Sequence, residues 1–540
     1  MQVAVVGAGI VGVTTAYELA VQGFEVTVFE RRSSVAAETS FANAGVIASG
    51  EVTPWAAPGM TWKVLRHALS RDTPVRFAGL GAVAQIPWLW RWLRACRSDV
   101  HEANCGAMQR LARLSRERML ELTHSLGLDF EQVGGYTVLL RGERETKAAQ
   151  RGLTLLRELG VVHELVDAAR CRQIEPALNP AAALHAAIHL PQGGVGNCRQ
   201  FAHLMKAEAT RLGATFRFDT DVQLLTPGTR PVVAFNGGRE MRFHAVVVCA
   251  GVQANAVLSG INLKLPLAPI YGYSVTAPVR HLDGQAPMGP RAAVMDERYK
   301  VAISRLGQRI RVAGSAEIGG KPGAMKMATL RTLYRVLDDW FPGSALTQQA
   351  QHWKGARPML PDGPPVLGES GAPGVWLNLG HGSSGWALAC GSARVLAERI
   401  SATVLRAGAQ PALVDPAAAL ATALQAVLAA TRAAWSTGVP EEALANATPY
   451  LQAFGHVVVA WMWLDVALAA GTRSGAIADI AANAVIGNSA DSVGSADPAR
   501  QGKLAAMHYF FGYELPKTAA WLAVVSSRNA TCRTMQDNWF

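Results

Sequence analysis

Three glycines and one acidic residue near the start of the chain have the types and spacing suited to binding a dinucleotide. Gly7, Gly9 and Gly12 come directly after an apolar run, in "VVGAGIVG", and Glu30 follows about 18 residues after the last of them. Glycines at these positions allow a tight turn, close approach of a pyrophosphate and close packing of a helix on a strand. Glu30 can accept hydrogen bonds from a ribose diol. These residues predict nucleotide binding but do not separate FAD from NAD.

Two strands and a helix must position these residues. "QVAVVG" is a valine-rich run typical of a buried parallel strand, and apolar residues then recur at helical spacing until Gly23. "EVTVFE" predicts the second strand, which ends at Glu30. The free N–H groups and the dipole at the helix start favour an anionic pyrophosphate. The cofactor contacts predicted in this unit are Val6, Gly7, Ala8, Gly9, Ile10, Val11, Gly12, Glu30 and Arg31.

Three later segments favour FAD. "ETSFANAG" (38–45) offers hydroxyls and amides for a ribityl chain and a pyrophosphate, and "RFHAVVVCAGV" (242–252) is a second buried strand that ends in glycine. "NLGHGSSGWALACGSA" (378–393) leads from a strand into a helix whose N-terminus can face the electron-rich end of an isoalloxazine ring. The contacts predicted here are Ser40, Asn43, Ala44, Gly45, Ala250, Gly251, Gly380, Gly382, Ser383 and Gly385.

The order of several motifs resembles the D-amino-acid dehydrogenase family, within the D-amino-acid oxidase and glycine oxidase group of flavoproteins. These motifs are "GAGIVGVTTAYEL", "ETSFANAG", "PWAAPG", "GYSVT", "ARPMLPDGPPVLG" and "GHGSSGWALACGS", which together span roughly residues 1–405. The resemblance implies non-covalent FAD and oxidative deamination of D-amino acids to 2-oxo acids and ammonia. It also implies that electrons pass to a quinone or another membrane acceptor rather than mainly to oxygen.

The substrate side of this chemistry needs a carboxylate clamp and an oriented C–H bond, because hydride leaves the α-carbon for flavin N5. Arg357, in "WKGARPMLPDG", matches the arginine that holds the substrate carboxylate in the resembled families. Tyr273 matches a position where relatives place a hydroxyl near the substrate, and Tyr271 and Tyr299 are weaker candidates. The glycine setting of His381 places it beside the flavin, and we assign it no role as a base. A structural ion pair for Arg357 and core packing for the tyrosines remain alternatives.

Composition excludes several other classes of protein. The net charge is +11, but the basic residues are dispersed, so we expect no nucleic-acid partner. Seven scattered cysteines without a CxxC motif fit a reducing cytoplasm and no metal site. We expect neither a signal peptide nor a transmembrane helix. The expected location is cytoplasmic, with peripheral contact to the inner face of the cell membrane as an option.

Two segments stand apart from the flavin motifs. Residues 76–97 mix Trp88, Trp90 and Trp92 with arginines, and we favour a packed helix there over a surface that touches the membrane. After about residue 405 alanine and leucine dominate, and the sequence resembles the C-terminal helical domain of some acyl-CoA dehydrogenases. We expect this tail to be an oligomerisation or docking unit, or a fusion whose helices lack their usual partner, and we expect no second activity from it.

The expected fold is α/β: a Rossmann-type FAD-binding domain, an α+β substrate domain with an antiparallel sheet, and an all-α extension. The expected boundaries are 1–75, 150–255 and 345–405 for the FAD domain, 76–149 and 256–344 for the substrate domain, 406–415 for a linker and 416–540 for the helical domain. Two alternative functions stay open: an FAD-dependent glycine or sarcosine-type amine oxidase, and a nucleotide-binding scaffold with a partner-docking tail.

Overall fold

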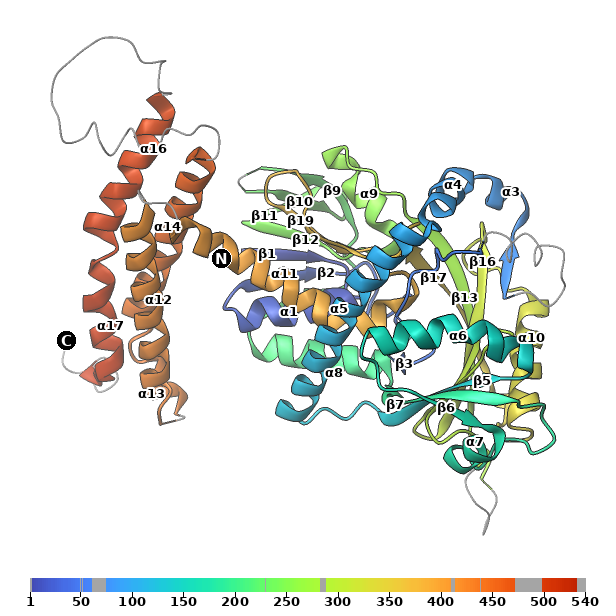
Figure 1. Ribbon diagram of the computed structural model, residues 1–540. Helices are drawn as coiled ribbons and strands as arrows, with labels where there is room; N and C mark the ends of the chain where they lie inside the picture. Colours follow the sequence, from blue (N-terminus) through green and yellow to red (C-terminus); the bar gives the residue numbers. More distant parts are fainter. Residues whose placement is uncertain are drawn as a thin grey trace. The chain divides into compact units, whose positions relative to one another are not determined.

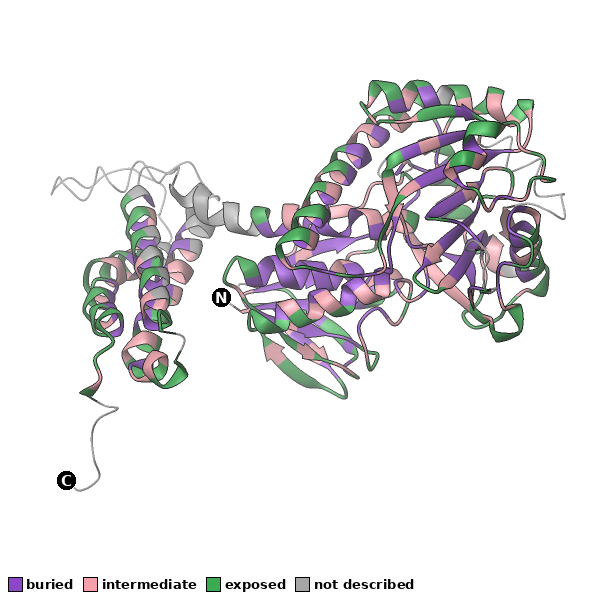
Figure 2. Ribbon diagram, turned by 90° about the horizontal axis from the view of Figure 1, so that it is seen from below, coloured by how far each residue is buried: buried purple, intermediate pink, exposed green. Residues whose placement is uncertain are grey.

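The computed structural model divides the chain into two units, residues 1–397 and 398–540 (Figure 1). The structure describes residues 2–48, 50, 52–60, 74–228, 230–281, 288–408, 413–437, 439–471 and 498–531. Figure 2 shows that buried residues concentrate in the strands of the first unit and along the inner sides of the helices of the second. Each unit therefore has a core of its own.

A six-stranded sheet in the order β18-β19-β12-β1-β2-β8 carries the N-terminal motif. Its strands are β1 (Gln2–Val6), β2 (Glu25–Phe29), β8 (Thr215–Arg217), β12 (Ala245–Val248), β18 (Val366–Glu369) and β19 (Val375–Leu379). All neighbours are parallel except β18, which pairs antiparallel with β19 at one edge. Every residue of β12 is buried, which explains its unbroken apolar run. Helix α1 (Ile10–Val21) packs beside α8 (Cys198–Arg211) on this sheet.

A larger sheet in the order β17-β13-β16-β15-β14-β5-β7-β3 forms the second layer, with β4 added beside β16 and β6 beside β7. Its strands are β3 (Val46–Ile47), β4 (Val75–Phe77), β5 (Val133–Leu140), β6 (Glu164–Asp167), β7 (Ala186–Val195), β13 (Ala268–Pro278), β14 (Ala293–Asp296), β15 (Val301–Leu306), β16 (Arg309–Ile318) and β17 (Gln351–Met359). Most pairs are antiparallel, and α10 (Met327–Trp340) packs on one face through a shared apolar core.

Four strands of this sheet lie outside the boundaries expected from the sequence. Strands β3, β6, β7 and β17 fall in segments that we assigned to the FAD domain, yet all four belong to the larger sheet. There β7 pairs with β5, β3 and β6 pair with β7, and β17 pairs with β13. The physical reason is that sheet membership depends on hydrogen bonds between distant segments, which local composition does not encode. A separate three-stranded sheet contains β9 (Val222–Thr226), β10 (Val232–Phe235) and β11 (Arg239–Arg242).

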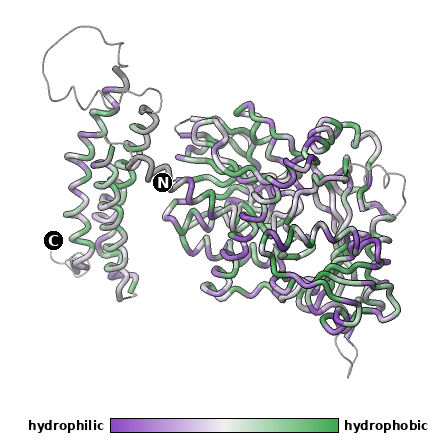
Figure 3. Tube along the Cα trace, in the orientation of Figure 1, coloured by the Kyte–Doolittle hydropathy of each residue, from purple (hydrophilic) through white to green (hydrophobic). Residues whose placement is uncertain are grey.

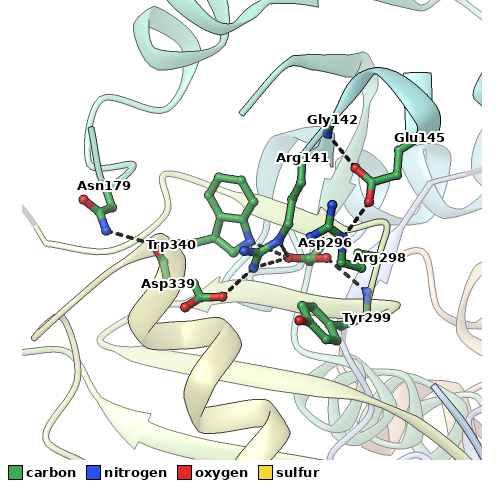
Figure 4. Close-up of polar contacts among 9 residues, drawn as sticks. All are labelled: Arg141, Gly142, Glu145, Asn179, Asp296, Arg298, Tyr299, Asp339 and Trp340. Atoms are coloured by element: carbon green, nitrogen blue, oxygen red, sulfur yellow. Dashed lines mark hydrogen bonds and ion pairs between the residues drawn. The ribbon is translucent and has the colours of Figure 1, made fainter. Parts of the chain in front are cut away.

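A buried ion-pair cluster ties β14 to the end of β5 and to α10 (Figure 4). Asp296 is fully buried and accepts hydrogen bonds from Arg141 Nε and Trp340 Nε1, both at 2.7 Å. Arg141 also donates to Asp339 at 2.7 Å and lies over the rings of Tyr299 and Trp340. The cluster fixes one end of the strand that carries residues 293–296.

The remaining helices of the first unit surround these sheets. They are α3 (Gly79–Val83), α4 (Ile86–Ala95), α5 (Ser98–Ser125), α6 (Glu143–Glu158), α7 (Ala168–Ile174), α9 (Ala254–Leu258) and the part of α11 (Gly385–Gly408) up to residue 397. Trp88 and Trp92 of α4 are buried, and Trp88 Nε1 donates to the carbonyl of Met359 at 3.0 Å. Trp90 between them is 62% exposed. Among the described helices, none combines the length and apolar character needed to cross a membrane.

The second unit is all-helical in its described part. Its helices are α12 (Val414–Ala434), α13 (Pro440–Leu444), α14 (Ala447–Gly471), α16 (Pro498–Tyr509) and α17 (Lys517–Ser527). Hydrophobic residues run along α12 and α14, and these helices pack with α17 around one apolar core (Figure 3). Helix α11 extends to residue 408, into the segment expected to be a linker. Residues 472–497 and 532–540 of the expected helical domain lie outside the described residues.

Candidate active site

The glycine turn between β1 and α1 is built by close backbone packing. Gly7 has φ +103°, and a Cβ there would lie 2.8 Å from the carbonyl oxygen of Cys249. A Cβ on Gly12 would overlap the carbonyl oxygen of Gly7, so this glycine lets the helix lie directly on the turn. A Cβ on Gly9 would meet only Ser40 Oγ, at 3.6 Å, which leaves its outer side open to a ligand. The three glycines therefore have the functions that the motif predicts. Gly7 and Gly12 allow close packing within the protein, and Gly9 faces a cavity.

Glu30 stands at the end of β2 and supports the same turn. Its carboxylate accepts hydrogen bonds from the backbone N–H of Ala8 at 2.7 Å and of Arg32 at 2.9 Å. The side chain is 9% exposed and borders the cavity beside Gly9. Arg31, at the rim, forms an ion pair with Glu38 at 2.8 Å. Glu30 is thus held in place before any ribose binds.

A cavity of about 190 Å³ opens at the carboxyl ends of the parallel strands. Most residues predicted to bind the cofactor line it, although they come from four separate parts of the chain. They are Val6, Gly7, Gly9, Ile10, Val11, Glu30, Arg31, Ser40, Asn43, Ala250, Gly251, Gly380, Gly382, Ser383 and Gly385, together with His381 and Arg357. Ala8 and Gly12 lie behind this lining, and Ala44 and Gly45 line a second cavity.

The 39–45 loop is fastened to the larger sheet through its backbone carbonyls. Ser274 Oγ donates to Ala42 at 2.8 Å and Ser304 Oγ donates to Ala44 at 2.7 Å. Buried Arg311 donates to the carbonyl of Asn43 at 3.0 Å. On the other side, Ser40 Oγ accepts from the N–H of Ile10 at the start of α1. The loop therefore links the glycine turn to the substrate sheet.

His381 lies between two glycines in left-handed conformations, Gly380 (φ +81°) and Gly382 (φ +56°). The imidazole is buried and lines the first cavity, and its Nε2 has no hydrogen-bond partner among the described residues. Burial lowers the pKa of His381 to about 3, so the ring is neutral at physiological pH. A buried nitrogen without a partner at a cavity wall fits hydrogen bonding to a bound cofactor.

The second cavity, of about 240 Å³, shares Arg357 with the first. Arg357 is on β17, and its Nη1 donates to the carbonyl of Ser315 at 2.9 Å. The described residues place no carboxylate in an ion pair with it, and the guanidinium is enclosed by protein on the sides away from the cavity. This burial lowers the pKa of Arg357 to about 10, which leaves it charged at neutral pH. An enclosed, unneutralised cation is suited to binding an anion.

The structure places the tyrosine hydroxyls away from this cation. Tyr273 borders the second cavity, but it pairs with Lys354 in the β-ladder, and residues 354 and 357 point to opposite faces of β17. Its hydroxyl donates to Glu317 at 2.6 Å, and Glu317 also binds Lys354 at 2.8 Å. The expected substrate hydroxyl is therefore engaged in a buried cluster on the other face. The reason is that the carboxylate of Glu317, itself buried, requires partners there.

Charges explain how this cluster is maintained. Burial alone would raise the pKa of Glu317, but hydrogen bonds from Lys326, Lys354 and Tyr273 hold it below its ordinary value. Burial and the bond to Glu317 raise the pKa of Tyr273. Lys354 Nζ lies 4.7 Å from the centre of the Tyr271 ring. Tyr271 thus belongs to the same cluster, whereas Tyr299 packs against Arg141 and Arg335.

Gly272, Trp353 and Gly355 are among the residues of the second cavity that sequence reasoning missed. Gly272 on β13 faces Gly355 on β17, and Trp353 lies two residues before Gly355. The alternation Trp353, Gly355, Arg357 was visible as a period-two pattern that puts all three on one face of a strand. The pairing of Gly355 with Gly272 was not visible, because it depends on the register of two distant strands.

Comparisons with known proteins agree with this architecture. Residues 2–399 match the family described as FAD dependent oxidoreductase, and residues 396–536 match the one described as Acetyl-CoA dehydrogenase C-terminal like. The chain is 40% identical over 403 residues to a D-amino acid dehydrogenase of Cereibacter sphaeroides, covering 74% of this chain and 92% of that protein.

Solved structures share the fold at lower identity. A glycine oxidase from Geobacillus kaustophilus superposes with a TM-score of 0.57 at 20% identity, over 74% of this chain and 95% of that one. An L-alpha-glycerophosphate oxidase from Mycoplasma pneumoniae with FAD bound gives 0.55 at 16% identity, over 74% and 94%. With the glycine turn, Glu30 and the His381 nitrogen arranged to receive the cofactor, residues 2–399 place this chain in the FAD-dependent oxidoreductase family.

Proposed function

We propose that the protein catalyses FAD-dependent oxidative deamination of D-amino acids to 2-oxo acids and ammonia and passes the electrons to a quinone or another acceptor that is not oxygen. The observation that carries this proposal is the position of Arg357, which lines both the nucleotide cavity and the second cavity. A substrate carboxylate held there lies next to the space that the cofactor enters. The similarity to D-amino acid dehydrogenases supports the choice of substrate.

The residues of the chain bind and orient rather than transfer protons. The planar guanidinium of Arg357 can hold both oxygens of a carboxylate, which fixes the α-carbon relative to the cavity wall. The hydride that leaves this carbon would pass to bound FAD, which would supply the two-electron acceptor. Loss of this hydride from the neutral amine leaves an iminium cation, which water hydrolyses to the 2-oxo acid and an ammonium ion. His381 stays neutral and offers Nε2 to a bound group, in the tautomer that the group requires.

Substitution of Arg357 tests this assignment. Arg357→Ala should keep bound flavin while kcat/KM for D-alanine falls at least about a hundredfold, since a two-point ionic contact is lost. Arg357→Lys keeps the positive charge but not the planar pair of N–H donors, so its kcat/KM should lie between that of the wild type and that of Arg357→Ala. Turnover with a dye acceptor and flavin absorbance are measured on each variant. Unchanged kcat/KM in Arg357→Ala would rule out the carboxylate role.

Two alternatives make different predictions. The glycine oxidase neighbours share the fold, so a glycine or sarcosine-type amine oxidase is the second candidate. Flavin bleached anaerobically by sarcosine but by no D-amino acid would establish it. The third candidate is a nucleotide-binding scaffold with a partner-docking tail, and it predicts that flavin stays oxidised with every amine.

We also propose a peripheral contact of the cytoplasmic enzyme with the membrane that holds its acceptor. Support comes from exposed Val83, Ile86 and Trp90 on α3 and α4, with Arg94 beside them on the exposed side. Such a surface should bind anionic vesicles, and binding should weaken with salt. Trp90→Ala should reduce co-flotation with these vesicles. No binding at low salt would exclude this contact.

A further inference from the structure

Two glycines face each other on neighbouring strands in the lining of the second cavity. Gly272 of β13 is paired with Gly355 of β17, and both border the cavity. Neither has a φ in the left-handed region, so the backbone conformation does not require glycine at either position. The requirement must come from the space that a side chain would occupy.

That space is filled by two different side chains. A Cβ on Gly272 would lie 2.6 Å from Cζ and 2.8 Å from Nη1 of Arg357. A Cβ on Gly355 would overlap the indole of Trp353, with Cζ3 at 2.9 Å and two further ring atoms closer still. The guanidinium therefore lies over one glycine and the indole over the other.

The strand geometry brings these groups onto one wall. Trp353, Gly355 and Arg357 alternate along β17, so their side-chain positions share one face of the sheet. Trp353 pairs with Ser274, whose hydroxyl binds the 39–45 loop, so this is the face toward the cofactor loop. Both Trp353 and Arg357 line the cavity. They approach the glycine pair from opposite ends of the same strand segment.

The rest of the lining defines the chemistry that the cavity accepts. Apolar and aromatic residues dominate it, among them Val52, Tyr136, Met295 and Trp386. Lys300 and Arg357 are the cationic side chains that border it, and none of the described lining residues is Asp or Glu. A second ammonium or guanidinium group on the substrate would enter without an anionic partner. Lys300 already pairs with Glu297 at 2.5 Å, so among the described lining residues an acidic side chain would meet no further unneutralised cation, and the lining favours an uncharged side chain.

We propose that the Gly272–Gly355 pair divides this wall between two tasks of substrate recognition. Gly272 seats Arg357 against the substrate carboxylate, and Gly355 seats Trp353, which limits the size of an uncharged substrate side chain. This inference rests on the proposed function, because it takes the substrate to be a D-amino acid. Gly272 and Gly355 are positioning residues, and Trp353 is a specificity-determining residue.

Substitutions at the two glycines should separate the tasks. Gly355→Ala forces the indole into the cavity, so the ratio of kcat/KM for D-phenylalanine to that for D-alanine should fall at least fivefold. Trp353→Ala should raise the same ratio at least fivefold. Gly272→Ala displaces the guanidinium, so KM should rise at least tenfold for both substrates while their ratio changes less than twofold. Wild-type enzyme should prefer D-methionine over D-arginine at least tenfold.

Gly134→Ala is the matched control, because Gly134 lies in β5 of the same sheet with no atom within 4 Å of an added Cβ. Gly134→Ala should leave the ratio of kcat/KM for D-phenylalanine to that for D-alanine unchanged. Should Gly355→Ala fail to fold, Trp353→Ala and Trp353→Phe give the ratio independently. If the wild-type enzyme turns over D-alanine but neither Gly355→Ala nor Trp353→Ala changes the ratio of kcat/KM for D-phenylalanine to that for D-alanine, this inference is overturned and the proposed function is not. A preference for D-arginine would overturn the uncharged class, and flavin that no D-amino acid reduces would overturn the proposed function with it.

Discussion

At the residue scale, the glycine turn allows effects on the protein to be separated from effects on the cofactor. Gly12→Ala should destabilise even the apoprotein, by about 1–3 kcal/mol, because its Cβ overlaps the Gly7 carbonyl oxygen. Gly9→Ala meets only Ser40 Oγ at ordinary contact distance, so the apoprotein Tm should be nearly unchanged while FAD affinity falls. Thermal melts of the apoproteins and fluorimetric FAD titration measure the two effects. Equal FAD affinity in wild type and Gly9→Ala would contradict the assigned role.

His381 gives a pH-dependent prediction at the same scale. Its pKa is about 3 when folded and near 6.5 when unfolded, so between these values the unfolded chain binds more protons. The stability contribution is complete above pH 6.5 and is lost as pH falls toward 3. At pH 5 the loss relative to pH 7 is about 2 kcal/mol. Denaturant unfolding of the apoprotein should show this slope, and it should be smaller in His381→Asn. If the free energy of unfolding of wild type and of His381→Asn depended on pH in the same way, the assignment of a buried neutral imidazole would be contradicted.

At the scale of elements, the ion-pair cluster around Asp296 should be a strong constraint on the larger sheet. Arg141→Met leaves a fully buried carboxylate without its main cationic partner, which should cost about 3–5 kcal/mol. The exposed pair Lys147–Glu143 is the control, since Lys147→Met should leave the unfolding midpoint nearly unchanged. Urea unfolding measures both. A midpoint for Arg141→Met equal to that of the control would show that the cluster does not hold β14.

The strands and helices also show how much of the fold could be predicted from the sequence. The first strand, helix and second strand were predictable because strand pattern, glycines and acid lie within 30 consecutive residues. The membership of β7 and β17 in the larger sheet was not predictable, because pairing between residues 46 or more positions apart leaves no local pattern. Arg357 and the cofactor-lining residues were predicted from motifs. The engagement of Tyr273 by Glu317 and the Gly272–Gly355 pair depend on strand register, which motifs do not specify.

At the scale of the whole molecule, the two units make a simple prediction about the tail. Unit 1 contains both cavities, and the helices of the second unit have a core of their own. We propose that the tail mediates oligomerisation or docking. A chain that ends after residue 408 should therefore keep FAD and dye-linked turnover within about twofold, while its mass by light scattering falls to that of a monomer. Loss of flavin on truncation would show instead that the tail supports the catalytic unit.

The proposed activity requires that a D-amino acid reduces the flavin of this enzyme. The most direct measurement is anaerobic mixing of the full-length protein with D-alanine and, separately, with L-alanine and sarcosine, while the flavin absorbance is recorded. We expect rapid bleaching by D-alanine, none by L-alanine, and restoration of the oxidised spectrum by a quinone analogue faster than by oxygen. Flavin that stays oxidised with every D-amino acid but bleaches with sarcosine would contradict the oxidation of D-amino acids by this enzyme.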